Sequence, residues 1–362
     1  MCRIWQVLPD YEQGVHYIGI AIAIAAFPSA AILAGIVIRY IIQVLKAIDY
    51  KELWKEIVGD RSNRSIIKTI GMTIIQLALA VLIGTALLTA VYILPTERIN
   101  YNVKRSAYTV EKEGADPVLY EWALSRLDNY TGSIMMLEAA CDPVSSPIKD
   151  AMNAPRGYNA NRRPDESLVA HYVNGVPFDG IMTYPRYWHG YLIFQKPLLE
   201  FMDYEAMRIL NGIVQFGLVL LICGLLLKTG NKSAGIAYFI AYLMLMPIAL
   251  AKSFQYSSCF YVFNLGCLPL LLLREERRRD CMYSIFLFCG ILTAFFDFLT
   301  YPISTFGVPM LLWLLLAGGK SVESKLGAII KNGLFWCIGF ASDRRQLTCD
   351  LDDQGRCDRN IH

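Results

Sequence analysis

The segment Ile66–Leu94 reads IIKTIGMTIIQLALAVLIGTALLTAVYIL, an apolar run in which Lys68 is the only charged residue. A long polar stretch, Thr96–Arg208, follows it, and apolar runs then resume. A bilayer core requires about 20 consecutive apolar residues in a helix, which this segment supplies. Because lipid offers no partner for free backbone amides, such spans must be helices. We therefore expect an all-α polytopic membrane protein that carries one large, mainly helical loop domain.

Further apolar runs lie on both sides of the polar stretch. The first, Tyr17–Tyr40, is too long for the apolar core of a signal peptide, and only Arg3 precedes it as a basic residue, so we expect a retained helix. The later runs are Ile209–Leu227, Ala234–Ala251, Phe260–Leu273, Tyr283–Leu299, Val308–Ala317 and Leu326–Phe340. Some of them need flanking residues to complete a crossing. Together the runs predict about eight transmembrane helices.

These patterns divide the chain into segments. We expect an N-terminal transmembrane helix and a cytoplasmic amphipathic linker in 1–65, a transmembrane helix in 66–94, an extracytoplasmic domain in 95–207, a transmembrane bundle in 208–340 and a polar tail in 341–362. The linker, Arg39–Gly59, fits either an amphipathic helix on the cytoplasmic leaflet or an extension of the first span. The last apolar run stops abruptly, which fits a short re-entrant helix or, as we favour, a truncated or frame-shifted chain.

Composition and charge support a multi-pass protein of the plasma membrane. Apolar residues make up 55% of the chain and charged residues 18%, with a mean hydropathy of +0.38. The basic residues gather in alternate short loops: Lys46, Lys51, Lys55, Arg61, Arg64 and Lys68; Lys228 and Lys232; Arg274, Arg277, Arg278 and Arg279; Lys320 and Lys325. Positive residues mark cytoplasmic loops, so residues 95–207 are expected outside the cytoplasm. The sequence has no basic face interleaved with aromatic residues, so it does not predict nucleic-acid binding.

The cysteines predict neither a disulfide framework nor a metal site. Of the ten cysteines, only Cys141 lies in the polar domain, and no pair has zinc-ligand spacing with a histidine nearby. We therefore expect no cofactor, although a divalent cation could bridge a carboxylate and a substrate phosphate. Within the domain we expect helices at Asp116–Leu127, Thr131–Cys141 and Asp165–Val173.

Aromatic residues are densest in Tyr184–Tyr191, which reads YPRYWHGY. An interfacial aromatic belt alone would explain Tyr187, Trp188 and Tyr191. Arg186 and His189 also fit a site for a phosphate and a sugar, because they add a cation and an imidazole to stacking rings. Both interpretations stay open from the sequence.

The segments Tyr184–Gly190, Leu192–Phe201 and Arg208–Asn211 resemble the juxtamembrane pattern of the GT-C superfamily of membrane glycosyltransferases. The chain is also similar to uncharacterised bacterial membrane proteins of polysaccharide loci that carry Leu-Asp-Asn-aromatic-Thr and Tyr-Pro-Arg-Tyr-Trp-His-Gly signatures. The resemblance covers most of Ile66–Phe340. It implies transfer of a sugar from a polyprenyl-phosphate donor during the assembly of cell-surface polysaccharide or glycolipid.

The resemblance also implies an acidic residue in the first outer loop. An acceptor hydroxyl must lose a proton as it attacks the anomeric carbon, and a carboxylate can serve as the base. Asp128, between two expected helices, is the candidate. Its alternative role is to cap the helix that includes Thr131. Family members usually have the acid close behind the preceding span, so Glu97 and Asp142 are rivals.

Substrate binding is expected to involve Arg186, Tyr187, Trp188, His189, Arg208 and Asp297. A donor phosphate needs cations, and Arg162, Arg163 and Lys196 are reserves for Arg186. A charge in an apolar segment, such as Asp297, indicates function unless it hydrogen-bonds a tyrosine such as Tyr256 or Tyr261. The alternatives to a transferase are a transporter or flippase, and a non-catalytic assembly or sensor protein.

Overall fold

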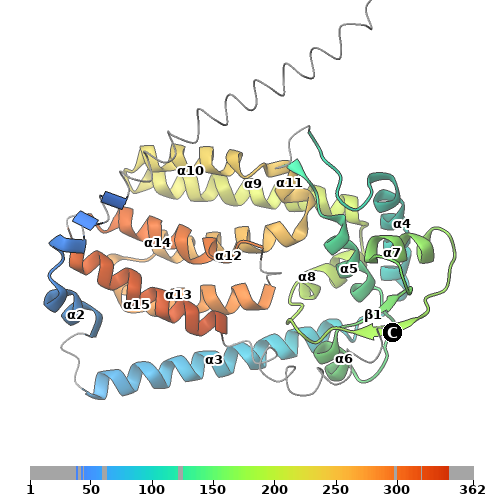
Figure 1. Ribbon diagram of the computed structural model, residues 1–362, viewed down its shortest axis with the longest axis horizontal. Coiled ribbons are helices and arrows are strands. Elements are labelled where there is room, and N and C mark those ends of the chain that lie inside the picture. The colour runs from blue at the N-terminus through green and yellow to red at the C-terminus, as the bar shows by residue number, and fades with distance from the viewer. Residues whose placement is uncertain are drawn as a thin grey trace, which may run out of the picture. The chain divides into compact units, whose positions relative to one another are not determined.

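The computed structural model describes residues 38–39, 42–43, 45–58, 63–120, 125–296, 300–318 and 320–341 (Figure 1). The chain divides into two units, one of residues 1–59 and 321–327 and the other of residues 60–320 and 328–362. The predicted first span falls almost wholly outside the described residues, as do the predicted tail and Asp297.

The first unit contains an amphipathic helix, α2 (Tyr50–Val58). Tyr50 and Trp54 lie one turn apart, and both are more than 60% exposed. Lysine and glutamate residues occupy the other side of the helix. The amphipathic helix expected in the linker is therefore present over α2, while its contact with a membrane stays a prediction.

The second unit contains long apolar helices of the kind that cross membranes. Within the described residues, α3 (Asn63–Val91), α9 (Tyr204–Lys228) and α13 (Glu275–Phe296) are long and apolar enough to span a bilayer, and α14 (Ser304–Leu316) is a shorter apolar helix. Three more helices of this unit are α10 (Lys232–Met244), the six-residue α11 (Pro247–Lys252) and α12 (Phe254–Leu272), while α15 (Val322–Ala341) begins in the first unit and continues in the second. The expected count of about eight spans stays a prediction.

The predicted span Ala234–Ala251 is wrong as a single helix. It breaks between α10 and α11, where Met246 adopts a left-handed conformation with φ of 54°. Pro247 begins α11, and a proline disfavours helical geometry in the residue before it while supplying no backbone N–H. The sequence signal for the break was therefore present in this proline.

Close packing holds the apolar helices together. α12 packs against α13 and α14, and α9 packs against α10, α11 and α12. Phe286, Met310 and Trp336 belong to one buried cluster. At Gly290 and Gly339 an added Cβ would collide with backbone atoms of the facing helix, so small residues allow α13 and α15 to touch.

The polar domain lies at one end of the long helices (Figure 1). It contains α4 (Glu97–Glu113), α5 (Asn129–Ala139), α6 (Pro147–Asn153), α7 (Pro164–Tyr172) and α8 (Leu192–Leu199). An antiparallel pair, β1 (Pro155–Tyr158) and β2 (Gly180–Thr183), pairs Pro155 with Thr183. Ile99, Met136 and Leu192 belong to its buried core.

The structure confirms two of the three helices expected in this domain, because α5 and α7 match their predicted positions within a few residues. The expected helix at Asp116–Leu127 is wrong over its described residues. There Val118 and Arg126 form an isolated antiparallel bridge, and the Leu127 amide donates to the Pro117 carbonyl over 2.8 Å. α4 and the β1–β2 pair were not predicted.

Candidate functional site

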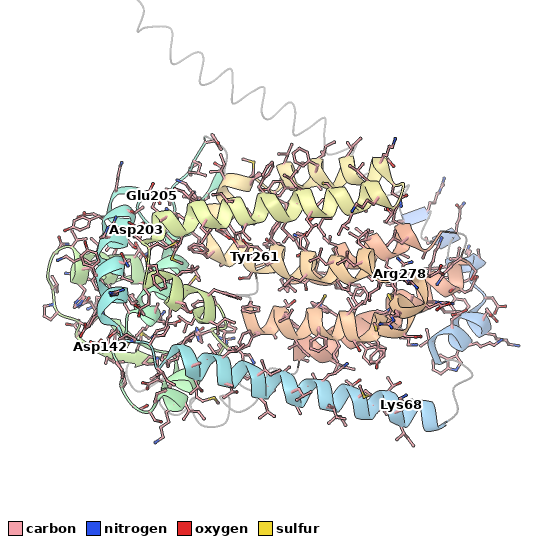
Figure 2. The ribbon with its side chains drawn as sticks, turned by 180° about the vertical axis from the view of Figure 1, so that it is seen from behind. Lys68, Asp142, Asp203, Glu205, Tyr261 and Arg278 are labelled. Atoms are coloured by element: carbon pink, nitrogen blue, oxygen red, sulfur yellow. The ribbon has the colours of Figure 1, made fainter. Side chains whose placement is uncertain are left out.

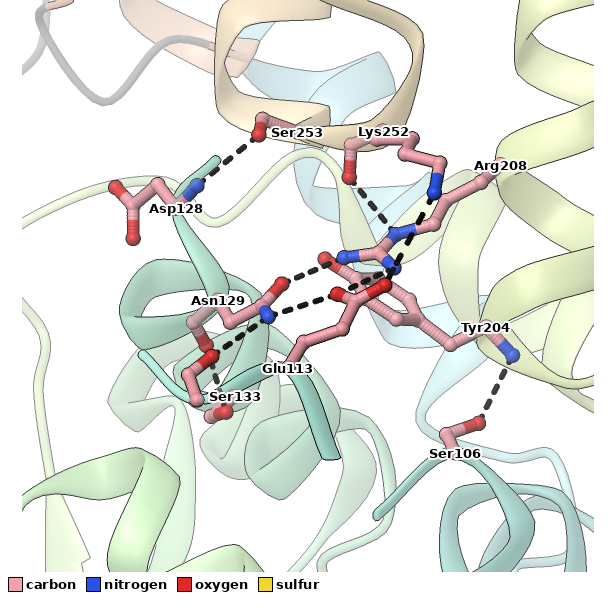
Figure 3. Close-up of polar contacts among 10 residues, drawn as sticks. Ser106, Glu113, Asp128, Asn129, Ser133, Tyr204, Arg208, Lys252 and Ser253 are labelled. Atoms are coloured by element: carbon pink, nitrogen blue, oxygen red, sulfur yellow. Dashed lines mark hydrogen bonds and ion pairs between the residues drawn. The ribbon is translucent and has the colours of Figure 1, made fainter. Parts of the chain in front are cut away.

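Asp128 lies where the polar domain meets the apolar helices (Figure 3). As the N-cap of α5, its Oδ1 accepts a 2.7 Å hydrogen bond from the Thr131 amide, and Oδ2 accepts a 2.8 Å bond from the Thr131 hydroxyl. From α12, the Gln255 side-chain amide also donates to Oδ2. The Asp128 amide donates to the Ser253 hydroxyl over 3.1 Å. The capping interpretation is thus confirmed, while the role as base stays a prediction.

Arg208, in the second turn of α9, anchors a network beside Asp128 (Figure 3). It is 3% exposed, and its Nη1 lies 3.1 and 2.9 Å from the two carboxylate oxygens of Glu113. Nη2 donates to Asn129 Oδ1 over 2.5 Å, and Nε donates to the Lys252 carbonyl over 2.9 Å. The guanidinium also lies over the Tyr204 ring, 4.2 Å from its centroid. Most of its donors are therefore committed within the chain.

Glu113 balances this buried cation. Burial alone would raise the pKa of Glu113, but hydrogen bonds from Asn129 and Arg208, together with the charges of Arg208 and Lys252, lower the pKa below its ordinary value. The carboxylate is therefore ionised at neutral pH. Lys252 Nζ lies 4.0 Å from Glu113, and the Lys252 side chain is 34% exposed, so this cation is much less enclosed than Arg208.

A groove of about 300 Å³ opens beside this network. Its lining comes from α9, α10 and α11: Glu205, Arg208, Ile209, Gly212, Tyr242, Pro247, Ile248, Ala251 and Lys252. Most of the lining is apolar, and the charged side chains come from the start of α9 and the end of α11. A groove of this composition suits an amphipathic ligand with an anionic group.

The start of α9 and two basic residues, Lys68 and Arg278, lie at opposite ends of the apolar helices (Figure 2). Figure 2 labels Asp203 and Glu205 at the end that meets the polar domain, and Lys68 and Arg278 at the other end. Lys68 and Arg278, two of the residues on which the predicted cytoplasmic side rests, therefore lie away from the groove (Figure 2).

His189 is buried inside the polar domain, where its ring nitrogens are paired within the chain. It is 3% exposed and has a positive φ of 54°. Its Nε2 lies 2.8 Å from the Tyr184 carbonyl, and its Nδ1 lies 3.0 Å from the fully buried Glu138 carboxylate and 2.9 Å from the Tyr191 hydroxyl. Tyr191 also donates to Glu138. The sequence did not identify Glu138, although a carboxylate within the apolar run of α5 was a signal.

The rest of the aromatic segment divides between core and surface. Trp188 is buried, and its ring centroid is 5.6 Å from that of Phe295 on α13. Arg186 is exposed, with its guanidinium 5.7 Å from the Tyr187 ring centroid. Neither Arg186 nor Tyr187 is among the residues that line the groove beside Arg208. Arg186 and Tyr187 are therefore surface candidates, separate from the groove.

The alternative site residues are dispersed. Glu97 is exposed at the start of α4, and Asp142 accepts a hydrogen bond from Thr96. Lys196 is only 1% exposed and lies over the Tyr92 ring, so it is enclosed within the polar domain. Burial lowers the pKa of Lys196 to about 8.

Of the two reserve arginines, Arg162 lines a second groove, between α4 and α7. Arg163 pairs with Asp116 at 3.6 Å and with Asp165 at 3.3 Å. Asp297 lies outside the described residues. The part of the chain that the structure describes contains no cluster of three or more histidine, cysteine or acidic residues able to hold a metal ion.

The junction is the region where the polar domain meets the apolar helices. The sequence did not identify four of its residues: Glu113, Lys252, Ser253 and Gln255. A weak signal was present in Lys252–Gln255, where polar residues separate two apolar runs. No family model matches the chain, and no curated protein or solved structure matches it either.

Proposed function

We propose that this chain is a membrane glycosyltransferase-like protein that transfers a sugar from a polyprenyl-phosphate donor in the assembly of cell-surface polysaccharide or glycolipid. One observation carries the proposal: a candidate base lies near a largely apolar groove whose charged lining residues are Lys252, Arg208 and Glu205. Asn129, next to Asp128, binds Arg208. Ser253, which binds the Asp128 amide, follows Lys252 in the chain.

The groove suits the two chemical parts of such a donor. Ile209, Pro247 and Ile248 offer an apolar wall for an isoprenoid chain, and they belong to helices of the apolar bundle. Lys252 would bind the phosphate, because charge-assisted hydrogen bonds to phosphate are strong, and the buried Arg208 would add its positive charge beside it. The cations would also stabilise the negative charge that develops on the leaving group.

In the proposed reaction the acceptor hydroxyl oxygen attacks the anomeric carbon of the donor sugar. A new carbon–oxygen bond forms, the bond between that carbon and the phosphate oxygen breaks, and polyprenyl phosphate leaves with the electron pair. Asp128 takes the proton of the hydroxyl as the attack proceeds. Residues 95–207 would lie outside the cytoplasm in the plasma membrane, with support from the basic residues at the far end of the bundle.

A transporter or flippase is the second candidate, and the break between α10 and α11 favours it. Transporters bind substrates at discontinuous helices, and α11 contributes four residues to the groove. A flippase would move the lipid across the bilayer without changing its sugar.

Photo-crosslinking tests the donor groove. The full chain in lipid nanodiscs is irradiated with a benzophenone-tagged polyprenyl phosphate, and labelled peptides are mapped by mass spectrometry. We expect label on α9 and α11, and about a tenfold or greater loss of label in Lys252→Gln, since hydrogen bonds to charged groups are worth about 1.5–3 kcal/mol. Lys228→Gln, at the other end of α9, is the matched control. Equal labelling of both variants would refute the groove.

A further inference from the structure

We propose that Gln255 is a positioning residue that aims the Asp128 carboxylate and offers its own amide oxygen to a hydroxyl of the sugar acceptor. The inference rests on the proposed function and names a part of the acceptor site that the sequence did not indicate. It concerns the bundle side of the junction, because Gln255 lies in the first turn of α12.

The orientation of the Gln255 amide follows from its partner. Gln255 is 2% exposed, and its side chain contacts Asp128 Oδ2. Nε2 is the only donor of this side chain, so it faces Asp128 Oδ2 while Oε1 turns away. Asp128 is consequently held from two sides. Thr131 fixes it from α5, and Gln255 and Ser253 fix it from the start of α12.

This double attachment would set the direction of a base. A capping aspartate held only by its own helix can still turn when that helix moves. Here the second contact comes from a residue 127 positions away, on an apolar helix. The carboxylate therefore keeps its orientation relative to the groove residues Lys252 and Arg208, because their helices belong to the same apolar bundle as α12. Such positioning is what aligns reacting groups in enzymes.

The side-chain oxygen of Gln255 has no hydrogen-bond donor among the described residues and can accept a hydrogen bond from a ligand. This oxygen, Oε1, is buried. A buried acceptor without a partner costs about 1–3 kcal/mol. A saccharide carries hydroxyl groups on adjacent ring carbons, so one hydroxyl can donate to Asp128 while its neighbour donates to Gln255 Oε1. The pair then binds the acceptor and selects the hydroxyl that reacts.

Gln255→Met tests the inference, with Gln215→Met as a matched control. Gln215, on α9, is also buried; its Nε2 donates to the Ser257 hydroxyl over 2.9 Å, and its Oε1 has no donor among the described residues. Both changes remove one buried amide from the same bundle and keep a side chain of similar length. Only the first removes a contact with Asp128.

Two readouts separate this inference from the proposed function. The first is labelling of Asp128 in the full chain by a water-soluble carbodiimide and glycine ethyl ester, measured by mass spectrometry. The second is product formation in cells at matched membrane abundance. In Gln255→Met we expect severalfold more labelling of Asp128 and a loss of product of about tenfold or more. The size of this loss follows from the free energy that a hydrogen bond to a charged group contributes. Gln215→Met should resemble the wild type in both.

Unchanged Asp128 labelling in Gln255→Met would overturn the inference. An equal loss of product in Gln215→Met would also overturn it, because packing would then explain the effect. If the wild type forms no product at all, the proposed function fails, and the labelling still decides whether Gln255 positions Asp128.

Discussion

Replacement of Arg208 by methionine should destabilise the folded protein by about 3–5 kcal/mol, the usual result of breaking a buried ion pair. The change removes the hydrogen bonds to Glu113, Asn129 and the Lys252 carbonyl, together with the contact over the Tyr204 ring. It also leaves the Glu113 carboxylate partly buried, with Asn129 as its remaining hydrogen-bond donor and Lys252 at 4.0 Å.

The double variant Arg208→Met, Glu113→Gln should recover part of this loss. No uncompensated charge is then buried, and the amide oxygen of the introduced glutamine can still accept the hydrogen bond from Asn129. We expect a cost of about 1–2 kcal/mol for the double variant and about 1–3 kcal/mol for Glu113→Gln alone. The coupling energy of the pair should therefore be at least about 2 kcal/mol, because the single losses sum to at least about 4 kcal/mol and the double variant loses at most about 2 kcal/mol.

Equilibrium unfolding of the four proteins in mixed detergent micelles, followed by circular dichroism, gives the free energies for this cycle. The lysine at the other end of α9 supplies a control, because Lys228→Met removes a cation that is not enclosed. Additive losses in the double variant would show that Arg208 and Glu113 act independently, and would refute the network as described.

Further predictions concern pH and packing. The pKa of Glu113 lies below its ordinary value of 4.5, so its stabilisation is present above pH 4.5 and is lost as the pH falls through the folded pKa. In Glu113→Gln the free energy of unfolding should therefore decrease less steeply as the pH is lowered. The pKa of Lys196 falls from 10.5 to about 8, so the free energy of unfolding should rise by roughly 3 kcal/mol between these pH values, and Lys196→Met should remove that rise. Gly190→Ala should lower the thermal midpoint, because a Cβ would collide with the Phe295 carbonyl, whereas Gly217→Ala, with open space around it, should not.

The class of the protein could be predicted because it depends on local pattern. In Ile66–Leu94 the apolar run alone requires a helix in lipid, and α3 covers most of it. Pro247 carried a local signal for the break after α10. In contrast, the helix expected at Asp116–Leu127 was wrong because the pairing of Pro117 with Leu127 depends on contacts across the loop rather than on propensity.

The junction could not be predicted beyond its individual members. Glu113 and Arg208 are 95 positions apart, and Asp128 and Gln255 are 127 apart, so one sequence gives no sign that they meet. His189 was identified as a binding residue from its aromatic neighbours, yet it is buried against Glu138. Only the fold reveals which polar residues face each other and which face a groove.

The most direct test of the central claim is product formation in cells carrying Asp128→Asn, with membrane abundance measured alongside. Asparagine caps a helix about as well as aspartate, so this change removes the base and preserves α5. Asp128→Ala, which also removes the cap, should cost about 1 kcal/mol of stability in addition.

We expect Asp128→Asn to reach normal abundance and to lose the polysaccharide or glycolipid product. Normal product from Asp128→Asn would contradict the account, because the residue would then be a helix cap and no base.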